Sequence, residues 1–133
     1  MNILVAEKDR TVLSKIIDLI RGWGYRAESS ENGRETLHRA GDEVFDLILL
    51  DTSLPDMAAT ELIVKLKELQ PEAGIVTMTA SNPNGLENEI RTLGIVYYML
   101  KPISQKILKE ILDHRSKKKK ASEPKVDVTL ART

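Results

Sequence analysis

The segment 46-DLILLDTSLPD-56 decides the fold class of this chain, and the segment 3-ILVAEKD-9 has the same form. In both, four consecutive apolar residues end on an acid: Asp51 follows residues 47–50, and Glu7 follows residues 3–6. A short continuous apolar run is typical of a strand that is buried on both faces of a parallel sheet. Because parallel strands end at one edge of their sheet, both segments are expected to deliver carboxylates to that edge, which indicates a site.

Short β-rich runs alternate with helical patterns five times along the chain, and this alternation predicts an α/β fold. The predicted strands are residues 2–6, 25–29, 47–50, 74–79 and 95–99. The predicted helices carry apolar residues at helical spacing and end near glycine or proline, as at Gly22, Pro71 and Gly94. Right-handed crossovers then give a doubly wound, five-stranded, flavodoxin-like parallel sheet of order 2-1-3-4-5, with helices on both faces.

In that strand order, ligands bind where strands one and three end. Glu7, Lys8, Asp9 and Asp51 are expected at this place. One candidate site therefore contains several acids and one lysine between two of them.

Composition and charge restrict the class of protein further. The 133 residues include no cysteine, which excludes disulfides and thiolate chemistry, and no apolar run approaches the roughly 20 residues that span a bilayer. A cytoplasmic protein without a membrane partner is expected. Residues 114–133 hold seven Lys or Arg against two Asp or Glu. We therefore predict a domain over residues 1–115 and a basic, disordered tail or linker over residues 116–133, with nucleic-acid binding a less favoured role for the basic run 115–120.

Polar residues also follow the two remaining predicted strands: Thr79 and Ala80 after the fourth, and Lys101 and Pro102 after the fifth. Together with the acids after strand one, the motifs occur in order as LLDTSLPDM around Asp51, TMTA and YYMLKP. A lone Lys-Pro or Thr-Ala pair carries no specificity, but the ordered set does. Over about residues 2–115 the chain resembles a response-regulator receiver domain of two-component phosphorelay signalling.

The resemblance implies that Asp51 accepts a phosphoryl group from a histidine kinase or a phosphotransfer protein. Such chemistry depends on positioning and on charge neutralisation. Lys101 would supply a cation to a phosphoryl oxygen, and the Thr79 hydroxyl would donate a hydrogen bond to another. Pro102 would follow a cis peptide bond that aims Lys101 inward. Apart from phosphotransfer and slow hydrolysis, no enzymatic activity is implied.

By the same resemblance, Thr79 and Tyr98 form a switch. Thr79 would move toward the phosphate and Tyr98 would turn inward, which changes the surface of the fourth helix, fifth strand and fifth helix. That surface would regulate a downstream protein or an output domain outside this chain. The alternative for Tyr98 is plain packing in a half-buried strand.

Receiver domains also hold Mg²⁺ through an acidic pair after strand one and the phosphoacceptor carboxylate. Glu7 and Asp51 match two of these ligands, but Lys8 stands where the second acid of the pair belongs, and an ammonium cannot bind a cation. Three interpretations compete. Mg²⁺ binding is weakened but survives with help from Asp9; the Lys8 ammonium enters the pocket and replaces the metal's charge, with a Coulomb term of about 4 kcal/mol for a Lys–Asp contact at ~4 Å; or Lys8 extends into solvent.

Two further departures concern single positions. Receivers commonly have glycine where this chain has Ala59, so the loop before it is expected to be rearranged. Ser53 and Ser81 occupy positions that tune dephosphorylation in the family, and their small hydroxyls predict no lifetime.

Two rival functions remain open. The first is an atypical receiver that acts as a phosphorylation-independent interaction module because of Lys8. The second is a small flavodoxin-like ligand binder, disfavoured because no glycine-rich phosphate loop follows strand one.

Overall fold

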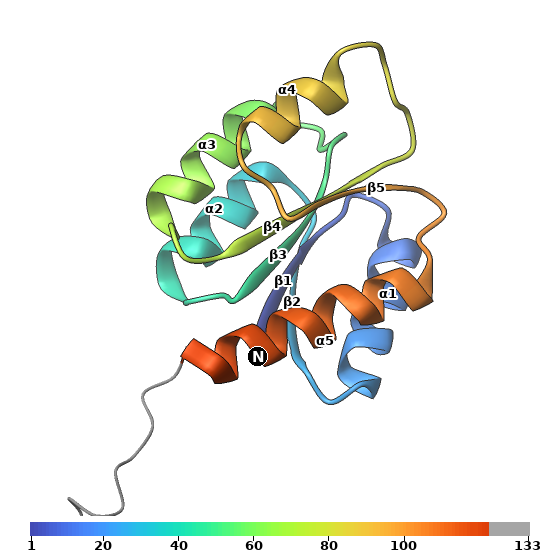
Figure 1. The fold of residues 1–133 in the computed structure, drawn as a ribbon. Helices are drawn as coiled ribbons and strands as arrows, with labels where there is room; N and C mark the ends of the chain where they lie inside the picture. Colours follow the sequence, from blue (N-terminus) through green and yellow to red (C-terminus); the bar gives the residue numbers. More distant parts are fainter. Residues whose placement is uncertain (123–133) are drawn as a thin grey trace, which may run out of the picture.

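The computed structural model describes residues 1–122, and within them five strands alternate with five helices (Figure 1). The elements follow one another as β1 (Asn2–Ala6), α1 (Arg10–Gly22), β2 (Arg26–Ser30), α2 (Gly33–Asp42), β3 (Leu47–Asp51), α3 (Ala59–Leu69), β4 (Gly74–Thr79), α4 (Leu86–Thr92), β5 (Tyr97–Leu100) and α5 (Gln105–Ser122). The strands are all parallel and lie in the order β2-β1-β3-β4-β5. The predicted fold class and strand order are therefore confirmed.

The central strands consist mainly of apolar residues because both faces of the sheet are covered. Every residue of β3 and β4 is buried. Helices α1 and α5 cover one face, and α2, α3 and α4 cover the other (Figure 1). Alternating residues of a strand thus enter two separate cores: Leu47 and Leu49 face α1 and α5, whereas Ile48 and Leu50 face the other helices.

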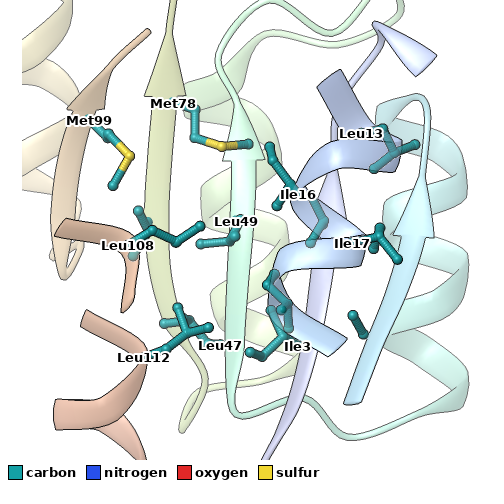
Figure 2. Packing of buried hydrophobic residues seen from close by; sticks show 14 residues of the cluster. Ile3, Leu13, Ile16, Ile17, Leu47, Leu49, Met78, Met99, Leu108 and Leu112 are labelled. Carbon is teal, nitrogen blue, oxygen red and sulfur yellow. The ribbon is translucent and has the colours of Figure 1, made fainter. Parts of the chain in front are cut away.

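Figure 2 shows the core beneath α1 and α5. Ile16 and Ile17 of α1 and Leu108 and Leu112 of α5 pack on side chains from the strands, including Leu49. The spacing of these helical residues is the one that the sequence predicts for an amphipathic helix on a core. This packing fixes the directions of the strands, and so it fixes the edge to which their last residues point.

The bounds of three strands differ from the prediction, and of these β3 is only one residue longer because it includes Asp51. Strand β2 begins at Arg26 instead of residue 25, because Tyr25 N–H still closes the end of α1 by donating to Ile20 O at 3.2 Å. Strand β5 runs over residues 97–100 instead of 95–99, since the chain first has to leave α4 through Gly94 in a left-handed conformation, with φ of 80°.

Helix α5 continues through Ser122, past the predicted domain end at residue 115. The first part of the segment that was predicted to be a tail is therefore helical, and the rest of that segment, residues 123–133, lies outside the described residues. No helix within residues 1–122 is both long enough and apolar enough to cross a membrane.

Candidate functional site

Three charged side chains from three strand ends meet at the carboxyl edge of the sheet. Glu7 follows β1, Asp51 ends β3, and Lys101 follows β5. Glu7 and Asp51 are 0% and 1% exposed, and the Lys101 side chain is 17% exposed. Lys101 Nζ donates to both carboxylate oxygens of Glu7, at 2.6 and 2.9 Å, and lies 3.6 Å from Asp51 Oδ2. The site is thus a buried pair of carboxylates that share one ammonium group.

The two oxygens of Asp51 have different surroundings. Oδ1 accepts a hydrogen bond of 2.9 Å from the backbone N–H of Ser53, which fixes the orientation of the carboxylate. Oδ2 is buried and has no hydrogen-bond partner among the described residues, although Lys101 faces it. Buried carboxylate oxygens without a partner are rare because each one loses its hydration. Oδ2 is therefore the oxygen available for a ligand or a reaction.

Glu7 holds its proton far more tightly than an ordinary glutamate. Burial raises its pKa from 4.5 to about 7, since removal from water disfavours the charged form. The hydrogen bonds from Lys101 lower the pKa, and the neighbouring Asp51 carboxylate raises it again. The one ammonium group of Lys101 does not balance the negative charge of two buried carboxylates, so additional positive charge at the site would be favourable.

Lys8 and Asp9, which precede α1, are both exposed, in contrast to the buried Glu7 and Asp51. Lys8 is exposed and makes no ion pair within the described part of the chain. Asp9 is the N-cap of α1: its Oδ1 accepts from the N–H groups of Thr11 and Val12, at 2.9 and 3.2 Å. Of the three interpretations of Lys8, the geometry favours the one in which the lysine extends into solvent, and it gives Asp9 a capping role instead of a place in the pocket.

Thr79 and Tyr98 both contact the loop between β4 and α4. The Thr79 hydroxyl donates to the backbone carbonyl of Ser81. Tyr98 is 5% exposed, its ring lies inward, and its hydroxyl donates to Asn82 Oδ1 at 2.8 Å. Burial raises the pKa of this phenol above its usual value of 10. The sequence does not single out Asn82, because an asparagine before a proline is an ordinary loop signal and only the fold brings it to Tyr98.

The remaining candidate residues lie around these groups. Ser53, Ala80 and Pro102 are exposed at the same edge, and the peptide bond between Lys101 and Pro102 is cis, as the resemblance implied. Ala59 is the first residue of α3, and no residue other than glycine has a positive φ in the described chain. The loop therefore accommodates alanine there without a left-handed residue.

The side chains present fit a hard divalent cation. Mg²⁺ is usually bound by one or two carboxylates together with waters and phosphate oxygens. Glu7 and Asp51 provide two buried carboxylates, and Asp51 Oδ2 has no hydrogen-bond partner in residues 1–122. A cluster of three His, Cys, Asp or Glu side chains suited to a metal does not occur in the same residues, which agrees with the loss of one acid to Lys8.

Several known proteins with similar sequences are transcriptional regulators. ZraR of Klebsiella oxytoca is 31% identical over 118 residues, which covers 86% of this chain and 27% of ZraR. CitT of Bacillus subtilis is 28% identical over 135 residues, which covers 98% of this chain and 59% of CitT. The chain therefore spans only part of the length of these relatives.

Solved structures agree with this relationship. A CheY-like receiver domain from Methanospirillum hungatei has a TM-score of 0.84 at 26% identity and covers 91% of this chain and 98% of its own. A two-component response regulator from Clostridium difficile has a TM-score of 0.83 at 22% identity, covers 88% and 96% of the two chains, and supports the fold. The model of the response regulator receiver domain matches residues 3–113, and the chain belongs to this family of two-component signalling domains.

Proposed function

We propose that Asp51 is the phosphoacceptor of this receiver domain and that Oδ2 is the attacking oxygen. The observation that carries the proposal is the asymmetry of the carboxylate: Oδ1 is held by Ser53 N–H, whereas Oδ2 is buried, lacks a hydrogen-bond partner in the described chain and faces Lys101 at 3.6 Å. A receiver domain is a signalling fold and not a conventional enzyme, so positioning and electrostatics are the main contributions that the site has to make.

In the proposed step, Oδ2 forms a bond to phosphorus while the bond from phosphorus to the donor's leaving atom breaks. That atom is a histidine nitrogen in a phosphorylated kinase or phosphotransfer protein, and an acetate oxygen in acetyl phosphate. Lys101 neutralises negative charge on the carboxylate and on the incoming phosphoryl oxygens, and Thr79 donates a hydrogen bond once its hydroxyl leaves Ser81. Slow hydrolysis, in which water attacks phosphorus, regenerates the carboxylate and releases inorganic phosphate.

Glu7 and Asp51 would hold Mg²⁺, which supplies positive charge to the transferring oxygens. Both Glu7 oxygens accept hydrogen bonds from Lys101, so a cation would have to share this carboxylate with the ammonium group. Glu7 would have to be ionised to act as a ligand, and burial raises its pKa to about 7, so this proton loss would fall near neutral pH.

We also propose the bounds of the domain, its location in the cell and its output. The receiver domain would comprise about residues 1–115, act in the cytoplasm, and regulate a downstream protein or an output domain beyond this chain. The transcriptional regulators ZraR and CitT, of which the chain matches only a part, support the second possibility. The rival role as a phosphorylation-independent interaction module is not favoured, since exposed Lys8 does not occupy the pocket.

Intact mass spectrometry after incubation with acetyl phosphate and Mg²⁺ tests the assignment. The wild-type protein is expected to gain one phosphoryl group, and Asp51→Asn is expected to gain none. Asp42→Asn, an exposed acid at the end of α2, is the matched control and should be phosphorylated like the wild type. Absence of the adduct on the wild type, or its persistence on Asp51→Asn, would refute the role of Asp51.

A further inference from the structure

The loop between β4 and α4 contacts both residues of the proposed switch through two consecutive positions. Ser81 O accepts the hydrogen bond from the Thr79 hydroxyl, and Asn82 Oδ1 accepts the hydrogen bond from the Tyr98 hydroxyl. Thr79 ends β4, and Tyr98 lies in the neighbouring strand β5, where it pairs with Thr77. Because Ser81 and Asn82 are adjacent in the chain, a movement of one shifts the other.

Tyr98 is held in its inward position from two sides. Its hydroxyl is bound by Asn82 at 2.8 Å, and the Arg91 guanidinium of α4 lies over its ring, with Cζ 5.8 Å from the ring centroid. Arg91 is oriented in turn by an ion pair of 2.9 Å with Glu87, one helical turn earlier. Cation–π contact adds to the stability of this arrangement, but the hydrogen bond is the contact that selects the direction of the hydroxyl.

We propose that Asn82 is a positioning residue of the switch: it holds Tyr98 inward in the unphosphorylated protein and links Tyr98 to Thr79 through the shared loop. This inference rests on the proposed function only for the roles of Thr79 and Tyr98 as a switch. Removal of the Asn82 oxygen takes away the 2.8 Å hydrogen bond of the part-buried phenol hydroxyl, so the inward position loses part of its advantage and the ring is expected to turn outward. In the protein with Asn82 in place, by contrast, Tyr98 already populates the inward conformation before any phosphoryl group arrives.

The link to phosphorylation follows from the Thr79 contact. When its hydroxyl turns to a phosphoryl oxygen, Ser81 O loses its hydrogen bond and the loop that carries Asn82 has to readjust. A conformation that already has Tyr98 inward requires less rearrangement than one with Tyr98 outward. Asn82 is therefore expected to favour phosphorylation of Asp51, by about fivefold if the hydrogen bond contributes its typical net free energy.

The decisive experiment observes Tyr98 in the unphosphorylated protein by NMR of ¹³C-labelled tyrosine rings, with the Tyr98 signal assigned by its loss in Tyr98→Phe. Asn82→Leu is expected to shift the Tyr98 signal toward that of a solvent-exposed tyrosine. Asn82→Asp retains an acceptor oxygen and should keep the wild-type signal. Asn84→Leu is the matched control, because Asn84 is exposed in the same loop and makes no hydrogen bond within residues 1–122. An unchanged Tyr98 signal in Asn82→Leu overturns the proposal.

A second measurement compares initial rates of phosphorylation by acetyl phosphate with Mg²⁺. The rate of Asn82→Leu should be about fivefold lower than that of the wild type, and Asn82→Asp and Asn84→Leu should stay near it. Equal rates for all variants, together with a shifted Tyr98 signal, would refute the link to Thr79. Lack of phosphorylation in the wild type would instead refute the proposed function of Asp51, while the NMR comparison still decides the role of Asn82.

Discussion

Glu7 is the residue whose ionisation couples the stability of the domain to pH. Its pKa is about 7 in the folded protein against 4.5 for an unperturbed glutamate, so the folded state binds the proton more tightly. For such a group the stabilising contribution is complete below pH 4.5 and is lost as the pH rises toward 7. The raised pKa corresponds to a loss on the order of 3 kcal/mol over this interval.

Glu7→Gln is therefore expected to flatten the pH dependence of stability. Urea unfolding between pH 5 and 8 should show a smaller decrease in the free energy of unfolding for this variant than for the wild type. Glu61→Gln, which removes an exposed carboxylate of α3, should leave the slope unchanged. Parallel curves for the wild type and Glu7→Gln would show that burial does not raise the pKa of this residue.

Lys8 is expected to limit the affinity of the proposed site for Mg²⁺. It is exposed beside a site in which two buried carboxylates share one ammonium, and it replaces a potential ligand with a positive charge. Lys8→Asp should raise the affinity for Mg²⁺ by at least about tenfold, since the change adds an oxygen ligand and removes repulsion. Titration calorimetry with Mg²⁺ measures the affinity. Lys15→Asp on α1 is the control, because it changes the net charge by the same amount. An equal gain in both variants would indicate a general effect of surface charge.

Asp9, which lies close to the site in the sequence, stabilises the first turn of helix α1. Asp9 accepts hydrogen bonds from two N–H groups of the first turn. Asp9→Ala should lower the free energy of unfolding by about 1 kcal/mol, whereas Asp9→Asn, also a good N-cap, should lose much less. Titration calorimetry with Mg²⁺ should give affinities within about twofold for Asp9→Asn and the wild type, since a cap that faces the helix does not bind the metal. A large loss of affinity would return Asp9 to the metal site.

For the molecule as a whole, the last turns of α5, the longest helix within residues 1–122, contact the segments that precede β3 and β4. Arg115 donates to Glu72 O at 2.9 Å, and Lys119 pairs with Asp46 at 3.2 Å. A chain that ends after residue 115 should be less stable than one that ends after residue 122, by about 1 kcal/mol, because it loses an ion pair and lets Arg115 fray. Thermal unfolding of the two chains decides this. Equal stability would support the domain boundary that the sequence predicts.

Much of the fold could be predicted because it depends on local patterns. The apolar runs that end at Glu7 and Asp51 predict buried parallel strands, and the alternation with helices, together with right-handed crossovers, predicts the strand order that the structure shows. The ordered motifs around Asp51, Thr79 and Lys101 predict that those residues lie at one edge of the sheet. The boundaries of β2 and β5 could not be predicted as well, since a backbone N–H at Tyr25 and a left-handed Gly94 settle them.

The family, the sheet and the residues at its carboxyl edge could be predicted from sequence patterns alone. The contacts among those residues became known only from the folded structure. Lys101 binds Glu7 more closely than Asp51, Lys8 stays in solvent, and Asn82 reaches Tyr98. Pairing among charged and polar groups depends on burial and on distances of a few ångströms between elements that are far apart in the chain. A local sequence pattern contains no information on these distances.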